Sequence, residues 1–312
     1  MDITLRQLSY FEALAETRSF SVAAARVNIS QPALSIQIKE LETRLEAQLI
    51  ERLPRDIRLT RAGQIVLERA QKLLADSRAL KQAVRLQSGL AGRLTLGVIP
   101  TIAPYLLPQA LTRIRAADLS LEIRVHEAQT EILLGELAQG RIDAAVLSLP
   151  IAQAGLEVRA LFEDRFVLAG SAARIAGLRE QGEALRPTHI PQDQLLLLDE
   201  GHCLGDQALE VCGLDRRAAR VDLGASSLAT LAGLVAEGFG LTFLPQIALR
   251  TESQAAPSLA LMRFRAPEPR RRIALVRRKS SEDAGWFGEL GDLLAEAGAA
   301  LLEQGAQACD PL

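Results

Sequence analysis

The sequence has few of the residues that staple or clamp a small protein together. Its 312 residues include 3 cysteines, 3 histidines and 1 tryptophan, and aromatic residues make up 4%. Three cysteines are too few for a disulfide framework. Packing, metal binding, catalysis and redox chemistry therefore remain as possible uses of these thiols.

The chain also lacks a long apolar run and a secretion signal. Its start, MDITLRQLSYFEALAETR, carries acidic residues early and has no apolar stretch before a small-residue cleavage site. The longest uncharged apolar stretch, near residues 223–236, is too short to span a bilayer. We therefore expect a cytoplasmic protein with no membrane segment, and 48% hydrophobic content suits two or three packed domains.

A strong overall charge is absent as well, since the formal net charge is −2. That value hides an asymmetry. Residues 1–90 hold 14 Lys and Arg against 10 Asp and Glu, and the remainder holds 22 against 28. A basic N-terminal module attached to an acidic body fits a protein that meets an anionic polymer at one end.

The first sixty residues predict a helix-turn-helix. Ser19 is a possible N-cap of a short helix around VAAARV, and Ser30 with Pro32 begins a second helix through ALSIQIKELETRL. Helical spacing collects an apolar stripe on that second helix, made of Leu34, Ile38, Leu41 and Leu45. The following segment, ERLPRDIRLT, predicts a β-hairpin wing.

The outer face of the second helix and the wing are the expected DNA contacts. Four polar or rigid residues would enter the major groove, namely Gln31, Pro32, Ser35 and Lys39. Ile36 on the same face either reads a thymine methyl group or packs on the wing. Three wing arginines would hold phosphates, namely Arg52, Arg55 and Arg58.

A long helix is predicted from about Arg61 to about residue 87. Val66, Leu73 and Leu80 are spaced seven residues apart, which favours pairing with another helix but also suits an amphipathic helix on its own domain. The small residues near 88–92 predict a hinge.

After the hinge, short apolar segments alternate with helical ones. Expected strands are RLTLGVIPT, LEIRVHEA, DAAVLSLP, RFVLAG, LLLLD, LTFLP and IALVRR. Two helical stretches end on glycine, at Gly140 and Gly238. This order predicts an α/β fold with parallel sheets, in which ligands bind beyond the carboxyl ends of strands.

The N-terminal text, from LRQLSYFEALAETRSFSVAAARVNISQPALSIQIKE onward, resembles the LysR-type transcriptional regulators. The resemblance implies an α+β multidomain chain, a winged helix-turn-helix plus a two-lobed α/β regulatory domain like the periplasmic binding proteins. The expected parts are a DNA-binding domain at 1–60, a linker and dimerisation helix at 61–88, a hinge at 89–92, a regulatory domain at 93–300 (lobe I about 93–163 and 267–300, lobe II about 164–266) and a tail at 301–312.

Residues 199–213, DEGHCLGDQALEVCG, hold two of the cysteines. Buried packing, a zinc site with His202, and a cysteine hydrolase using His126 or His189 are open alternatives from the residues alone. If DQALEV is helical, the Cα atoms of Cys203 and Cys212 lie roughly 13 Å apart. A disulfide tolerates about 7 Å at most, so a bond between them requires unwinding. Cys203 at the helix start is the expected attacking thiol.

The stretches GVIPTIAPYLLP, HEAQT, DEGHCLGDQALEVC and PEPRR are similar to the peroxide-sensing members of the family. That similarity implies that hydrogen peroxide oxidises Cys203 and that Cys212 closes a disulfide. It further implies a pocket made by Thr101, Thr130, His202 and Arg271. From the residues alone, Thr130 is equally an N-cap and Arg271 a solvated charge. Two positions after Cys203, where a peroxide-sensing member has an arginine, this chain has Gly205, so that source of positive charge is missing.

The sequence therefore predicts a redox-responsive regulator rather than an enzyme, with no cofactor and no metal. Its expected partners are double-stranded promoter DNA, RNA polymerase, and further copies of itself as a dimer of dimers. Two alternatives remain open, namely a LysR-type regulator that senses a small metabolite and a thiol peroxidase with an accessory DNA-binding domain.

Overall fold

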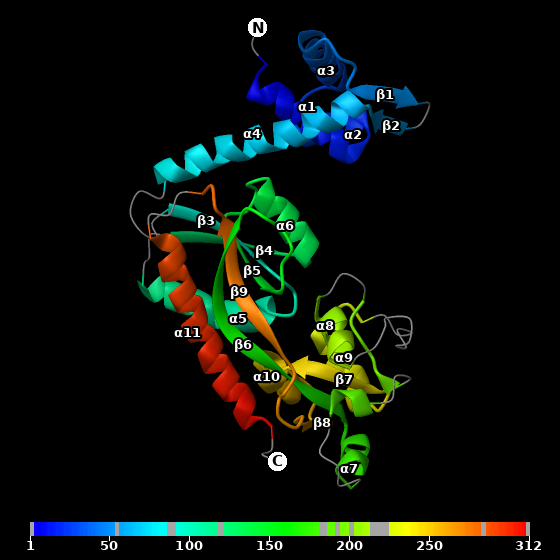
Figure 1. Cartoon of the computed structure of the whole chain (residues 1–312), viewed down its shortest axis with the longest axis vertical. Coiled ribbons are helices and arrows are strands. Elements are labelled where there is room, and N and C mark those ends of the chain that lie inside the picture. Colours follow the sequence, from blue (N-terminus) through cyan, green and yellow to red (C-terminus); the bar gives the residue numbers. More distant parts are fainter. Residues whose placement is uncertain are drawn as a thin grey trace. The chain divides into compact units, whose positions relative to one another are not determined.

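The computed structural model divides the chain into two compact units (Figure 1). The N-terminal unit comprises residues 1–84 with 138–141, and the C-terminal unit comprises 85–137 and 142–312. The structure describes residues 3–53, 56–85, 92–117, 121–180, 186–190, 194–199, 203–212, 225–281 and 285–309.

The N-terminal unit packs three helices around one core, α1 (Leu5–Thr17), α2 (Phe20–Arg26) and α3 (Gln31–Leu45). Each helix begins at a hydroxyl side chain, of Thr4, Ser19 or Ser30, that accepts a backbone N–H from the first turn. The predicted stripe of α3 is confirmed, because Leu34, Ile38 and Leu41 are fully buried and Leu45 packs against them.

The wing and the long helix follow as the sequence predicts. Strands β1 (Ile50–Leu53) and β2 (Asp56–Leu59) pair antiparallel. Helix α4 (Arg61–Arg85) begins where the Thr60 hydroxyl accepts the N–H of Gly63 at 3.0 Å. Along α4, Leu73 and Leu80 are exposed within this chain.

The described part of the C-terminal unit forms a seven-stranded sheet with the order β4-β3-β5-β9-β6-β7, and β8 pairs with β6. The strands are β3 (Gly92–Val98), β4 (Leu121–Glu127), β5 (Ala144–Leu149), β6 (Leu156–Ser171), β7 (Leu241–Pro245), β8 (Leu259–Met262) and β9 (Arg270–Arg278). Strand β3 runs parallel to β4 and β5, whereas β6 and β9 are antiparallel to their neighbours. The sheet is therefore mixed, and the prediction of parallel pairing throughout is wrong for β6 and β9.

Strand β6 joins the two halves of this unit. Residues 156–165 pair with β9, whereas 166–171 pair with β7 and β8. Helices α5 (Ala103–Ala117) and α11 (Trp286–Gln307) lie on one side of the first half and α6 (Thr130–Ala138) on the other (Figure 1). The remaining helices are α7 (Ala172–Glu180), α8 (Cys203–Cys212), α9 (Leu228–Ala236), α10 (Leu249–Ala255) and the short turns η1 (Pro187–His189) and η4 (Gln246–Ala248).

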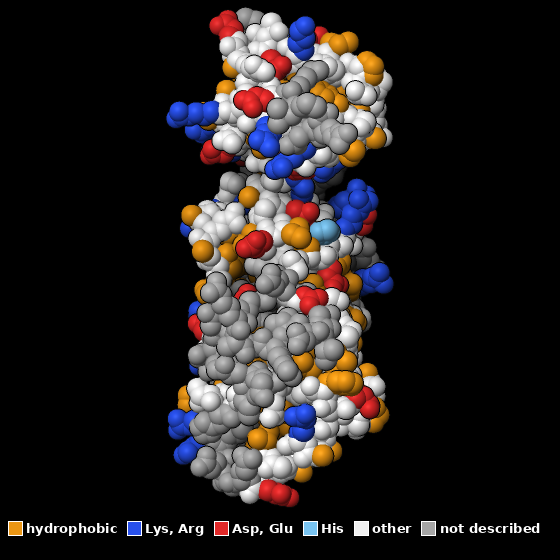
Figure 2. All heavy atoms as spheres, turned by 90° about the vertical axis from the view of Figure 1, so that its right-hand side faces the viewer, with side chains coloured by type: hydrophobic (Ala, Val, Ile, Leu, Met, Phe, Trp, Pro, Cys, Tyr) orange, Lys and Arg blue, Asp and Glu red, His pale blue; other side chains and the backbone are white. Residues whose placement is uncertain are grey.

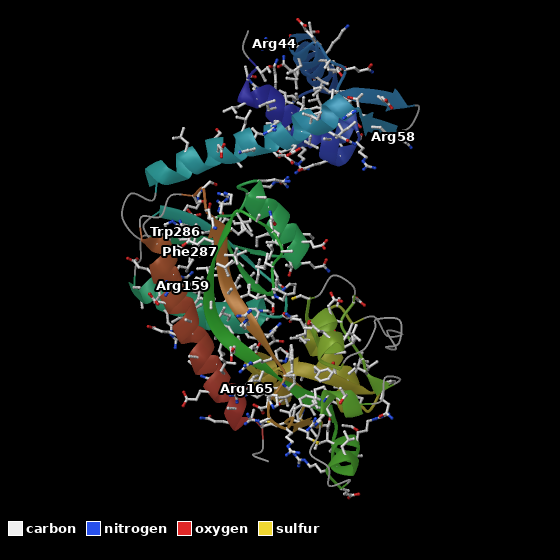
Figure 3. All side chains as sticks on the ribbon, viewed as in Figure 1. Arg44, Arg58, Arg159, Arg165, Trp286 and Phe287 are labelled. Carbon is white, nitrogen blue, oxygen red and sulfur yellow. The ribbon has the colours of Figure 1, made fainter. Side chains whose placement is uncertain are left out.

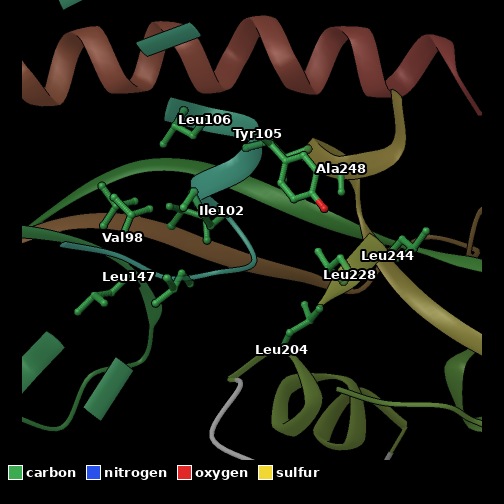
Figure 4. Packing of buried hydrophobic residues seen from close by; sticks show 14 of the residues in the cluster. Val98, Ile102, Tyr105, Leu106, Leu147, Leu204, Leu228, Leu244 and Ala248 are labelled. Atoms are coloured by element: carbon green, nitrogen blue, oxygen red, sulfur yellow. The ribbon is translucent and has the colours of Figure 1, made fainter. Parts of the chain in front are cut away.

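A continuous cluster of buried side chains fills both halves. Figure 4 shows Val98, Ile102 and Leu147 of the first half in the same cluster as Leu204 and Leu228 of the second. Leu204 is the second residue of α8 and is buried, so the first turn of this helix packs into the core.

Several sequence predictions need correction. The segment LLLLD forms two isolated bridges, at Leu195 and Leu198, rather than a strand, because few backbone groups find a ladder partner there. Helix α11 continues to Gln307, so the predicted tail at 301–312 begins later. Gly92 belongs to β3 rather than to the predicted hinge, and the other hinge residues, 89–91, lie outside the described part. The predicted helix ends at Gly140 and Gly238 are confirmed, since both have positive φ.

Within the described residues, no helix is both long and apolar enough to cross a membrane.

Candidate functional site

Three hydroxyl side chains gather at one edge of the sheet. Thr101 follows β3, Thr130 follows β4, and Ser148 lies near the end of β5. Because β3 runs parallel to both neighbours, the carboxyl ends of the three strands meet at the same edge. The N–H of Ala128 donates to the carbonyl of Val98, which keeps the ends of β3 and β4 level.

Arg271 is directed at this edge from β9. Its side chain is 0% exposed, and Nη1 donates to Thr101 Oγ1 at 2.8 Å while Nη2 donates to the Thr101 carbonyl at 3.2 Å. The alternative of a solvated surface charge is therefore wrong. Arg270 and Arg272 are exposed, because alternate residues of a strand point to opposite faces.

Asp164 on β6 completes the buried pair. Its Oδ2 accepts Nε of Arg271 at 3.0 Å and Nη2 at 2.9 Å, and its Oδ1 accepts the N–H of Ile247 at 3.1 Å. Burial raises the pKa of the Asp164 carboxyl, and the Arg271 guanidinium and the N–H of Ile247 oppose that rise. Asp164 and Arg271 face each other directly in the β6–β9 ladder.

A second buried polar contact lies on α5. The Tyr105 hydroxyl donates to Glu252 Oε1 of α10 at 2.6 Å. Burial, followed by this hydrogen bond and the Glu252 charge, raises the pKa of Tyr105, while the Arg271 charge lowers it. The phenol therefore stays protonated and serves as a donor across the two helices.

Helix α8 carries the two cysteines at its two ends, as the sequence predicts. Cys203 is a free, half-buried thiol that packs against the core. Nine residue steps of α-helix place the Cα atoms of Cys203 and Cys212 roughly 13 Å apart. The side chain of Cys212 and the whole of His202 lie outside the described residues.

Gln207 attaches α8 to the same sheet edge. Its Nε2 donates to Ser148 Oγ at 2.8 Å and to the Leu149 carbonyl at 3.1 Å. Cys203 and Gln207 are four residues apart on one helix, so their side chains share a face. The face of α8 that carries Cys203 is therefore turned toward the carboxyl ends of the strands.

Two oxygens in this region are buried without a hydrogen-bond partner among the described residues, Thr130 Oγ1 and Gln207 Oε1. Thr130 begins α6, and its hydroxyl does not cap that helix, which argues against the plain N-cap role. Buried oxygens of this kind suit a small polar guest that both donates and accepts hydrogen bonds.

The alternatives of a zinc site and a cysteine hydrolase involve residues outside the described part, since His202 and the side chain of Cys212 lie there. Among the described residues, no group of three or more His, Cys, Asp or Glu side chains suited to a metal is found. His126 lies on β4, and its Nε2 is 3.2 Å from Oε2 of Glu136 on α6. The side chain of His189 is outside the described part.

The outward face of α3 carries the predicted base contacts. Gln31, Pro32 and Lys39 are exposed, Ser35 is half-buried, and Ile36 is 58% exposed. Described residues of the wing therefore do not cover Ile36. Two hollows flank it, one lined by Arg6, Tyr10, Ile29, Ala33 and Gln37, the other by Lys39, Glu40, Thr43 and Arg44.

On the wing, Arg58 of β2 is exposed (Figure 3). The backbone of Arg52 lies in β1, but its side chain and all of Arg55 lie outside the described residues. Figure 2 shows basic side chains of the N-terminal unit interspersed with acidic ones rather than gathered in one patch on that face.

Sequence reasoning missed Asp164 and Gln207. Asp164 is 107 residues from Arg271 along the chain, and an acidic residue in a strand carries no signal of its partner. Gln207 lies within the motif that holds the cysteines, four residues after Cys203, and this helical spacing was the one available indication.

Comparisons with known proteins agree with this architecture. Residues 5–64 match the bacterial regulatory helix-turn-helix protein, lysR family, and residues 87–298 match the LysR substrate binding domain. A probable hydrogen peroxide-inducible genes activator of Streptomyces viridosporus is 41% identical over 94% of both chains. The transcriptional regulator EstR of Acinetobacter baylyi is 36% identical, over 96% of this chain and 98% of EstR.

Among solved structures, an H2O2-bound mutant of Corynebacterium glutamicum OxyR aligns with a TM-score of 0.66 and 34% identity, covering 100% of this chain and 98% of that one. Family matches over both units and similarity along nearly the whole chain lead to one assignment. The chain belongs to the LysR family of bacterial transcriptional regulators, and it resembles the hydrogen peroxide-inducible activators within that family.

Proposed function

We propose that this regulator senses hydrogen peroxide through Cys203 and Cys212. The observation that carries the proposal is α8, which places Cys203 on the face turned to the sheet edge and Cys212 at the far end. Its similarity to peroxide-inducible activators supports the same signal.

In the proposed reaction the Cys203 thiolate attacks one peroxide oxygen, so that an S–O bond forms as the O–O bond breaks. The other oxygen leaves as hydroxide and takes up a proton, which yields a sulfenic acid and water. The Cys212 thiol then attacks the sulfenic sulfur and releases a second water. Peroxide gains the two electrons that the two thiols lose.

Four side chains are proposed to form the peroxide pocket, Thr101, Thr130, His202 and Arg271. The hydrogen bond from Arg271 to Thr101 supports this assignment, as does the buried hydroxyl of Thr130, for which the described residues offer no hydrogen-bond partner. Their donors would stabilise the negative charge on the departing oxygen.

The disulfide acts through the shape of α8. A bond needs Cα atoms within about 7 Å, so the helix must unwind and Gln207 must leave Ser148 and Leu149. The oxidised and reduced chains would then hold two different packings, as a switch requires.

We propose that this change reaches promoter DNA through paired copies of the chain. Exposed Ile65, Leu73 and Leu80 on α4 support a helix pair, and a dimer of dimers would carry the signal to RNA polymerase and to antioxidant genes. The base contacts are Gln31, Pro32, Ser35, Ile36 and Lys39, and the phosphate contacts are Arg52, Arg55 and Arg58.

We further propose lobe I at about 93–163 and 267–300 and lobe II at about 164–266. The change of partner along β6, from β9 to β7 and β8 near residue 166, supports this division.

The test is peroxide titration of three purified proteins, the wild type and two variants. The wild type should consume about one equivalent of peroxide per subunit and change its footprint on duplexes selected from a random library. Cys203→Ser should do neither, and Cys309→Ser, which removes a buried thiol at the end of α11, should behave as wild type. Unchanged footprints of oxidised wild-type protein would refute the switch.

The match to a substrate binding domain favours a second candidate, a regulator of a small metabolite. That function predicts that Cys203→Ser keeps its inducer response. A thiol peroxidase would instead turn over peroxide steadily with a reductant, whereas a sensor reacts stoichiometrically.

A further inference from the structure

The polar edge of the sheet contains a carboxylate whose place in the peroxide chemistry has not been assigned. Asp164 lies where β6 passes from one half of the C-terminal unit to the other, opposite Arg271 in the ladder. Both side chains are 0% exposed. A buried charge pair at such a junction is costly unless each partner is fully hydrogen-bonded.

We propose that Asp164 is a positioning residue for the reaction at Cys203, acting through Arg271 on Thr101. The inference rests on the peroxide function proposed above. Asp164 sets the direction in which the Thr101 hydroxyl can donate a hydrogen bond, and it is not itself proposed to contact the thiol or the peroxide.

The geometry of the guanidinium supports this role. Asp164 Oδ2 accepts two N–H groups, from Nε and Nη2, which fixes the plane and rotation of the Arg271 fork. The Nη1 and Nη2 end of the fork is thereby aimed at Thr101, where Nη1 reaches the hydroxyl and Nη2 the carbonyl. The N–H of Ile247 holds Asp164 itself through Oδ1.

The hydrogen bond to Thr101 has a chemical consequence. A threonine hydroxyl has one donor hydrogen, and its oxygen accepts from Arg271, so the hydrogen is left for another group. In the reaction the hydroxyl would donate a hydrogen bond to the peroxide oxygen that leaves as hydroxide while the S–O bond forms, which stabilises the negative charge on that oxygen. The oxygen then takes up a proton from solvent to give water, and Thr101 keeps its own proton.

A purely electrostatic role for Arg271 predicts the opposite effect of losing Asp164. Asp164→Asn keeps the size of the side chain and removes its negative charge, so that the positive charge of Arg271 is no longer balanced. If that charge alone promotes thiolate attack, the variant reacts faster. If Arg271 works by orienting Thr101, the variant reacts more slowly.

The experiment measures the second-order rate constant for hydrogen peroxide and, separately, for iodoacetamide, which alkylates the same thiol without needing a hydrogen bond from Thr101 to its leaving group. Asp164→Asn should slow the peroxide reaction at least tenfold and leave alkylation within about twofold. Asp143→Asn, which alters a half-buried carboxylate that accepts the N–H of Thr95, should change neither. A general loss of structure would slow or speed both reactions.

A double variant tests the route through Thr101. Thr101→Val with Asp164→Asn should react with peroxide as slowly as Thr101→Val alone, because both changes remove one interaction. Multiplied defects, or an Asp164→Asn rate equal to or above wild type, would overturn the proposal. A wild type inert to peroxide would refute the sensor function instead.

If Asp164→Asn does not fold, Asp164→Glu carries the same test. It keeps the charge and moves it by about one methylene, so it should misdirect the fork and slow only the peroxide reaction. An unchanged peroxide rate in folded Asp164→Glu would contradict the positioning role.

Discussion

Ile36 is an apolar side chain on a helix face that otherwise presents polar groups. It lies on α3 between two hollows, with Lys39 lining one of them, and it is 58% exposed. Apolar side chains at such positions contact the methyl group of thymine in the major groove. Ile36 therefore has a base-specific role in our account.

Replacing thymine by uracil in a selected duplex tests this role, because uracil lacks only the methyl group. At one position the loss should be about fourfold in affinity, which corresponds to about 0.8 kcal/mol for one methyl group. Ile36→Ala should abolish that difference, and Val22→Ala, an exposed apolar residue on α2, should keep it. Equal affinities for both duplexes in wild type would contradict the assignment.

Asp143 makes stability depend on pH. Burial raises the pKa of its carboxyl, and the N–H of Thr95 and the Arg278 charge oppose this. Between the usual and the raised pKa, the folded chain holds a proton that the unfolded chain has released, so wild-type stability falls as pH rises through that window. In urea unfolding, Asp143→Asn should gain stability relative to wild type as the pH rises from the usual carboxyl pKa through the raised one; a difference that does not change with pH would exclude this cause.

Residue roles were predictable from the sequence where local spacing sets them. The stripe of Leu34, Ile38 and Leu41 follows from helical period alone. The burial of Arg271 between exposed neighbours follows strand alternation once β9 is known. Its partner Asp164 was not predictable, because pairing across 107 residues depends on strand register that no local pattern encodes.

Helix α11 buries large side chains such as Trp286 and Leu294, and it packs against β6 through glycines as well. A Cβ atom on Gly298 would lie 2.3 Å from the Phe162 ring of β6. Nearby, Arg159 of β6 crosses toward the start of the helix, and its Nη1 donates to the Gly288 carbonyl at 2.5 Å (Figure 3). The close approach of helix and strand therefore needs a residue without a side chain.

Gly298→Ala should lower the free energy of unfolding by about 1–3 kcal/mol, the usual cost of overpacking. Gly135→Ala is the matched control, because this helical glycine of α6 has no atom within 4 Å of its Cβ position. It should be neutral or stabilising by up to about 1 kcal/mol. Equal effects in urea unfolding would show that the contact with Phe162 is not tight.

The proposed unwinding of α8 on oxidation would lower the stability of the packed domain. Leu204, Ala208 and Leu209 are buried, and fully burying one leucine contributes about 1.5–3 kcal/mol. Unwinding α8 exposes part of this surface unless it repacks, so disulfide formation must offset the loss. The ten-residue helix was predictable from its residue types, but its attachment to β5 through Gln207 was not.

At the scale of the whole molecule, element order was predictable and sheet direction was not. Alternating apolar and helical segments correctly indicated an α/β unit after a helix-turn-helix. Strand β9 pairs antiparallel with β5, although the two strands are far apart along the chain. The apolar pattern of a segment such as LTFLP or IALVRR does not specify the partner or the direction of a long-range pairing.

In the proposed switch, peroxide joins the two ends of α8 covalently. Mass spectrometry of the peptide spanning residues 199–213, after stoichiometric peroxide and alkylation of free thiols, measures this directly. We expect a Cys203–Cys212 disulfide, with the peptide unalkylated and two hydrogens lighter than the reduced peptide, while Cys309 stays reduced. Two alkylated thiols in residues 199–213 at every peroxide dose would contradict it.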